Sequence, residues 1–150
     1  MANYYGITKT NYFHVNDPEG FKKLMRRVVS DEGDIDLWED KDKDGNPVFA
    51  FGGYSSISGI CPIENNNDDS EDEDYDEADY DLFVSELQKL IVDGEAIIIT
   101  EIGHEKLRYI TAYSTVITKD GCEYVTLERR AAAKARDMLG NQKYNPDAYD

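Results

Sequence analysis

The stretch from Glu64 to Asp81 limits how this chain can fold more than any other part of it. It contains 11 aspartates and glutamates and no lysine or arginine. Like charges at this density repel one another, and the few apolar side chains among them cannot offset the entropy lost on ordering. We therefore expect an acidic insertion at 64–81, flanked by two portions of chain that fold together.

The acidic insertion also accounts for most of the charge of the protein. The net charge is −16; the insertion supplies −11 of it, and the remaining −5 is ordinary for a soluble domain. Phosphates would be repelled, so direct binding to DNA, RNA or anionic membranes is disfavoured. A basic protein is the partner that this charge favours.

Two kinds of periodicity predict the secondary structure outside the insertion. Alternating β-branched and aromatic residues indicate strands, and apolar residues three or four positions apart indicate helices. The expected elements are strand 4–15, a helix from Asp17-Pro18 to Gly33, strands 34–39 and 47–54, a helix from about Asp79 to Gly94, strands 96–101, 107–118 and 122–126, and a helix over 127–139.

Capping and turn residues support these boundaries. Asp17 is a good N-cap and Thr126 another, while Gly140 is a typical helix stop. Asp44-Gly45 suits a hairpin turn. The Gly103–Glu105 stretch is expected to turn the chain between two strands.

This order of elements, β-α-β-β-α-β-β-β-α, predicts an α+β fold. Short connections favour a mostly antiparallel sheet of about six strands, with helices packed on one face. The length of 150 residues suits one domain, which we place at residues 1–140. Residues 141–150 are expected to form a polar tail.

The acidic insertion has a functional interpretation beside that of a solvated loop. If a helix reached back to Asp72, then Asp72, Asp76 and Asp79 would share one face, about 6 Å apart along the axis. Repeated anions at that pitch would mimic a nucleic-acid backbone, and tyrosines are favoured in interfaces. The candidate partner-binding residues are Glu71, Asp72, Glu73, Asp74, Tyr75, Asp76, Glu77, Asp79, Tyr80 and Asp81.

A second acidic motif resembles half of a calcium loop. Asp40, Asp42 and Asp44 match its first oxygen ligands, and a glycine follows them. Position 12 would be Phe51 where a bidentate glutamate is needed, and Pro47 replaces the apolar residue of the loop. We therefore expect a charged hairpin tip, with weak calcium binding as the alternative.

The sequence contains no recognisable catalytic arrangement, so we expect neither an enzyme nor a cofactor. His104 has Glu101 and Glu105 near it in sequence, but this spacing is not diagnostic of a metal site. Cys61 and Cys122 lack metal-binding or redox spacing, and the N-terminus lacks signal-peptide features. A cytoplasmic location is expected.

Two segments carry a resemblance. The sequences NYYGITKTNYF at 3–13 and GHEKLRY at 103–109 resemble short proteins of phages and mobile elements of Gram-positive bacteria. The acidic segment is similar in character to small anti-CRISPR and antirestriction proteins. This resemblance implies a cytoplasmic inhibitor, acting in a host bacterial cell, of a basic nucleic-acid-binding defence protein such as a CRISPR effector nuclease. The alternative is a non-catalytic interaction module whose acidic segment serves only solubility.

Overall fold

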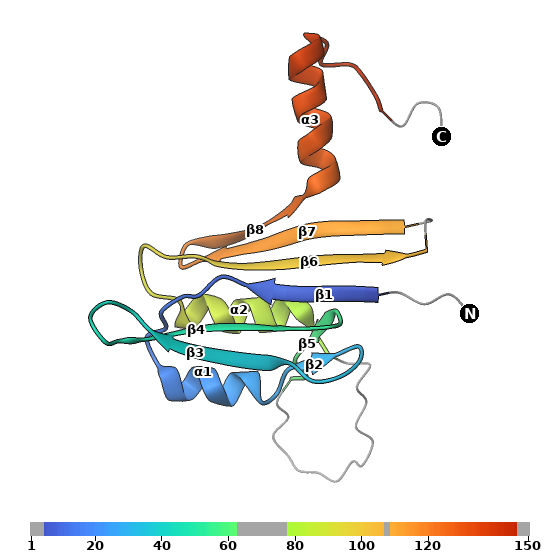
Figure 1. Cartoon of the computed structure of the whole chain (residues 1–150). Coiled ribbons are helices and arrows are strands. Elements are labelled where there is room, and N and C mark those ends of the chain that lie inside the picture. Colours follow the sequence, from blue (N-terminus) through green and yellow to red (C-terminus); the bar gives the residue numbers. More distant parts are fainter. Residues whose placement is uncertain (1–4, 63–77, 107–108, 147–150) are drawn as a thin grey trace.

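A computed structural model describes residues 5–62, 78–106 and 109–146 of the chain (Figure 1). In chain order the elements are β1 (Tyr5–Thr10), α1 (Pro18–Met25), β2 (Val29–Ser30), β3 (Asp36–Lys41), β4 (Pro47–Gly53), β5 (Ile57–Gly59), α2 (Tyr80–Leu90), β6 (Ile97–Glu105), β7 (Tyr109–Thr118), β8 (Gly121–Thr126) and α3 (Leu127–Leu139).

Six of the strands form one antiparallel sheet in the order β3-β4-β1-β6-β7-β8. The hairpins β3-β4, β6-β7 and β7-β8 join neighbours in sequence, whereas β1 lies between β4 and β6. The predicted α+β class, with its mostly antiparallel sheet, is confirmed. A separate pair, β2-β5, was not predicted.

One face of the sheet packs against α1 and α2, and the core lies between them (Figure 1). All five phenylalanines of the chain are almost fully buried there. Their rings form a connected series, with Phe13 against Phe21 and Phe51, and Phe51 against Phe83. Aromatic side chains dominate core energetics because each removes a large apolar area from water.

The opposite face of the sheet, which we call the open face, is covered by none of the helices that the structure describes (Figure 1). Alternation along each strand points every second side chain toward it. Six large exposed side chains follow this alternation: Tyr5, Ile7, Trp38, Ile98, Ile102 and Ile110. The third helix, α3, leaves the β8 edge and projects away from the sheet instead of covering it (Figure 1).

Some predicted boundaries were wrong. The first helix ends at Met25, not Gly33, and β2 follows at the β-branched Val29. Gly103–Glu105 is not a turn, because β6 continues to Glu105 and these residues pair with β1 and β7. Cross-strand pairing on both sides outweighs the local turn preference of glycine. Among the described residues, no helix is long and apolar enough to cross a membrane.

The acidic insertion leaves and re-enters the fold at one place. Ile60 and Asp79 form an isolated antiparallel bridge, in which the Asp79 N–H donates to the Ile60 carbonyl at 2.8 Å. Gly59, just before the bridge, has φ +123° and passes close to the Asp79 backbone. Residues 79–81, expected to belong to the insertion, are therefore part of the fold, and the chain on either side of residues 63–77 is held together.

Candidate protein-binding surface

An exposed row of carboxylates follows β3 and the loop before it. Residues 31–40 contain six acids and no lysine or arginine, and β3 is an edge strand whose six residues are all exposed. We call this row the acidic edge: Asp31, Glu32, Asp34, Asp36, Glu39 and Asp40. Charge on an edge strand also prevents pairing with other chains, so the row has a structural role whatever else it does.

Most of the acidic edge has no basic partner in the fold. Among the described residues, the lysine–carboxylate ion pairs are Lys22 with Glu39 at 3.5 Å and Lys89 with Glu86 at 3.0 Å. Only Glu39 of the acidic edge is therefore neutralised, and partly exposed pairs of this kind are weak. The remaining carboxylates project a negative potential into solvent.

A groove of about 760 Å³ begins where the acidic edge begins. Asp31 and Glu32 line it together with Tyr5, Tyr54 and His104. The Tyr54 side chain is 83% exposed, and the Tyr5 and His104 rings lie 5.6 Å apart. Carboxylates beside exposed aromatic rings suit an arginine or lysine side chain, which can pair with the acids and lie over a ring.

A buried carboxylate is hydrogen-bonded to one residue that lines this groove. Glu101 is only 7% exposed and accepts hydrogen bonds from the Ser56 hydroxyl at 2.6 Å and the Tyr113 hydroxyl at 3.0 Å. Ser56 lines the groove, so these bonds position its rim. His104 points to the opposite face of β6 from Glu101, so sequence proximity does not bring the two together as metal ligands.

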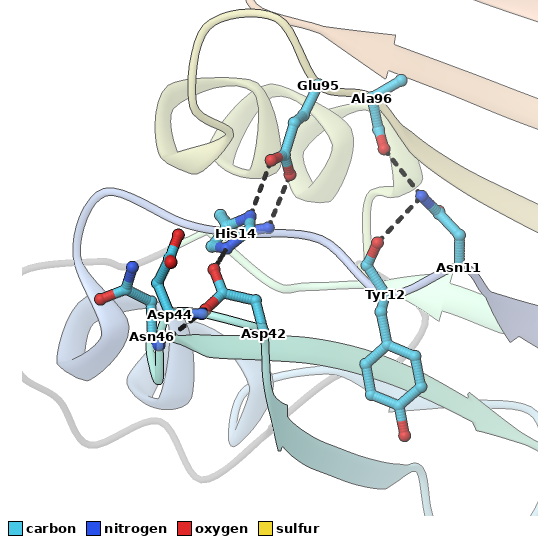
Figure 2. A network of polar contacts seen from close by, with 8 residues as sticks. All are labelled: Asn11, Tyr12, His14, Asp42, Asp44, Asn46, Glu95 and Ala96. Atoms are coloured by element: carbon cyan, nitrogen blue, oxygen red, sulfur yellow. Dashed lines mark hydrogen bonds and ion pairs between the residues drawn. The ribbon is translucent and has the colours of Figure 1, made fainter.

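The far end of the acidic edge is held by His14 (Figure 2). Its Nδ1 lies 2.7 Å from Glu95 Oε2 and its Nε2 lies 2.6 Å from Asp42 Oδ2. Asp42 Oδ1 also accepts the backbone N–H groups of Asp44 and Asn46. Ionised carboxylates can only accept hydrogen bonds, so both bonds form together only when the imidazole is protonated and both ring nitrogens donate. We call His14, Asp42 and Glu95 the clasp, because together they link the β3-β4 turn to the loops before α1 and β6.

The charge of the clasp depends on pH in a defined direction. Hydrogen bonds to Asp42 and then to Glu95 raise the pKa of His14 above its ordinary 6.5. The bond from His14 lowers the pKa of Asp42 below 3.8, with help from the Asn46 backbone N–H. The stabilisation from His14 is complete below pH 6.5 and is lost as the pH rises through the higher folded pKa. The stabilisation from Asp42 is present above pH 3.8 and is lost as the pH falls through the lowered pKa of Asp42 in the folded protein.

We expect His14→Gln to remove this pH dependence on the alkaline side. In the unmodified chain, raising the pH from about 6 to about 9 should lower the free energy of unfolding by on the order of 1 kcal/mol, after solvent screening of partly exposed groups. The glutamine variant should be less stable at pH 6, and its free energy of unfolding should change less between the two pH values. Urea unfolding at each pH measures this. An equal alkaline loss in both proteins would contradict the clasp.

The structure places only some of the predicted binding residues. Those from Glu71 to Glu77 lie outside the described residues. Asp79 is the N-cap of α2, where its side chain accepts the Leu82 N–H, and its backbone is extended. The helix therefore begins at Tyr80 and does not extend back through Asp79, while Asp72 and Asp76 lie outside the described residues.

Tyr80 and Asp81 both contact the sheet. The Tyr80 hydroxyl is 2.8 Å from that of Thr115, and its ring packs on Phe83. Burial raises the pKa of Tyr80. Asp81 accepts a hydrogen bond from the Tyr124 hydroxyl at 2.9 Å, and burial, followed by this bond, raises the pKa of Tyr124 to about 12. In this arrangement these side chains fix α2 to β7 and β8.

The aspartates of the half calcium loop point to different partners. Asp42 is taken by His14 and the turn, while the Asp40 side chain accepts the Lys41 N–H. No group of three metal-binding side chains occurs within the described part of the chain. A hairpin tip, as predicted, is what the structure has at 42–46.

Sequence reasoning missed the acidic edge and the clasp. The edge could have been found by counting charge over 31–40, where the alternation of β3 also places Asp36, Trp38 and Asp40 on one side. The clasp had no local signal, because His14 is 28 residues from Asp42 and 81 from Glu95.

Comparison of the chain with protein-family models, curated proteins and solved structures finds no match.

Proposed function

We propose that this protein is a non-catalytic inhibitor that binds a basic, nucleic-acid-binding host defence protein, of which a CRISPR effector nuclease is the leading example. The single observation that supports this is the acidic edge, whose carboxylates are exposed and, apart from Glu39, lack a basic partner among the described residues. The predicted binding residues at 71–81 add to the same negative charge.

Charge complementarity explains the class of partner. A protein that binds nucleic acid presents lysines and arginines spaced to meet phosphates. An acidic surface would occupy that site and exclude the nucleic acid. Long-range attraction would accelerate the encounter, and the acceleration would fall as salt screens it.

The groove gives this contact a specific element as well as a general one. Tyr5 and Tyr54 offer exposed rings beside Asp31 and Glu32. Tyrosine is enriched at interface positions that carry most of the binding energy, as is arginine on the opposing side. An arginine of the partner inserted here would be held by both charge and stacking.

Neutralising the acidic edge should weaken binding more than an equal change of charge elsewhere. Four lost charge contacts of a few tenths of a kcal/mol each correspond to about a tenfold loss of affinity. Partners captured from a bacterial lysate and released by salt would be tested by competition with labelled nucleic acid and by nuclease inhibition. The edge variant changes to amides Asp31, Glu32, Asp34 and Asp36; the matched control changes Glu19, Glu86, Asp93 and Asp120.

A second variant tests the predicted segment separately, by converting its acids at 71–77 to amides. Inhibition that survives both variants would remove the carboxylates from the mechanism and leave an interaction module whose acidic segment only aids solubility. An equal loss of inhibition in the control variant would mean that only the net charge of the protein matters, and not the position of the acidic edge. Either result contradicts the proposal.

A further inference from the structure

Within the described part of the chain, the third helix meets only the ends of β7 and β8 and the tail that follows it. None of the residues of α3 is buried, and Leu127, Met138 and Leu139 are all at least 60% exposed. The helix has 13 residues, and helices shorter than about 12–15 residues are marginal in water without tertiary contacts. An amphipathic helix that projects into solvent therefore needs a surface to pack on.

The apolar side of α3 is a defined stripe. At 100° per residue, Leu127, Ala131, Ala135 and Met138 fall on one side, with Leu139 at its border. The tail turns back along the helix, held by a hydrogen bond from Arg136 Nε to the Tyr144 carbonyl at 2.9 Å. It leaves the three large apolar side chains exposed.

The helix cannot reach the open face of its own sheet. Thr126 is both the last residue of β8 and the N-cap of α3, where its hydroxyl accepts the Arg129 N–H. No loop residue lies between the two elements, so folding back would break this cap. The helix α3 can therefore pack on an open face only if that face belongs to another molecule.

The charges of α3 and of the open face are opposite. The helix carries four basic and two acidic side chains, a net +2 in a chain of −16, so the rest of the protein carries −18. On the open face, Asp36 and Asp40 stand on β3 and Glu123 on β8, with one lysine, Lys9 of β1, between them. On α3, Arg130 and Lys134 border the apolar stripe on one side, while Glu128 borders it on the other.

The sizes of the two surfaces also agree. A 13-residue helix is about 20 Å long, enough to cross four strands at about 4.8 Å spacing. Six large side chains on the open face and three on α3, each between 38% and 78% exposed, are available for such a contact.

We propose that two copies of this chain form a symmetric dimer in which α3 of each copy packs across the open face of the other. The contact is reciprocal, so each copy contributes one helix and one sheet face. It covers Tyr5 and the side of β3 that carries Asp36 and Asp40, so a dimer and an inhibitory complex would compete for these residues, but the dimer is argued independently of the proposed inhibitory function.

Sedimentation equilibrium over a concentration series tests the dimer with the full chain. It is run in reductant, because Cys122 is exposed, and at physiological salt, where repulsion between the two acidic copies is screened beyond about 8 Å. We expect a species of twice 17.1 kDa. A monomer at every concentration would overturn the proposal.

Three variants locate the contact. Met138→Glu places a charge in the stripe of α3 and Ile110→Glu places one on the open face, where Ile110 is 77% exposed. Each should weaken dimerisation at least about tenfold. Ala133→Glu makes the same change of charge on the other side of α3 and should leave the dimer intact. Circular dichroism checks that all three fold.

Mixing the two disruptive variants distinguishes this dimer from a helix-to-helix one. The Ile110→Glu chain keeps an intact helix and the Met138→Glu chain keeps an intact sheet face. A mixed pair can therefore form one complete contact, and association should be stronger in the mixture than in either variant alone. Failure of the mixture to associate would show that α3 does not pack on the open face.

Discussion

Phe51→Ala is expected to lower the free energy of unfolding by about 3–5 kcal/mol, the usual cost of removing a fully buried phenylalanine. Phe51 is 0% exposed, and its ring contacts Phe13 on one side and Phe83 of α2 on the other. Alanine would leave a cavity where the rings linking α2 to the sheet meet. Because domains of this size are stable by only about 5–15 kcal/mol, the loss is a large share of the total.

Urea unfolding followed by circular dichroism measures this loss. Tyr54→Ala, just after the same strand, is the matched control, because its side chain is 83% exposed and such changes usually stay within about 0.5 kcal/mol. A loss below 1 kcal/mol for Phe51→Ala would mean that neighbouring side chains fill the cavity, which would contradict the prediction.

Gly59→Ala should destabilise the protein by about 3 kcal/mol or more. A Cβ on Gly59 would lie 2.3 Å from both the carbonyl carbon and the carbonyl oxygen of Asp79, and φ there is +123°. Backbone atoms cannot move aside as a flexible side chain can. The bridge between Ile60 and Asp79 would open, and the cap that begins α2 would shift with it.

Two other glycines separate the causes of this effect. Gly33 has φ +76° but open space around it, so alanine there should cost about 1–2 kcal/mol from conformation alone. Gly121 has neither a positive φ nor a close neighbour, and its alanine variant should be nearly neutral. Thermal unfolding of all three should rank Gly59→Ala as the least stable. Equal losses at positions 59 and 33 would remove the close approach as a cause.

Local signals account for the part of the fold that was predicted. The caps Asp17 and Thr126 and the stop at Gly140 act within one helical turn, and each is observed where expected. The hairpin β3-β4 was predicted because the Asp44-Gly45 turn separates an alternating run at 34–39 from an apolar run at 47–54, and the two strands do pair. The pairing of two antiparallel strands joined by a short loop can be predicted from the sequence of that hairpin alone.

Long-range contacts account for the rest. The insertion of β1 between β4 and β6 pairs Thr8 with Gly53 and with Glu101, and no local pattern specifies either partner. Periodicity predicts that α3 is amphipathic, but it does not say what the apolar stripe contacts. The binding surface was likewise assigned from charge density at 71–81, while the structure reveals a second acidic surface whose position depends on which strand lies at the sheet edge.

The bridge between Ile60 and Asp79 has a consequence for how this protein can vary. Since Ile60 and Asp79 are hydrogen-bonded to each other, the two ends of the segment between them are fixed about one strand spacing apart. Lengthening a connection between fixed ends costs only about 0.6 kcal/mol in closure entropy for each doubling. We therefore expect inserted residues between positions 60 and 79 to be tolerated better than insertions within β1 or β6.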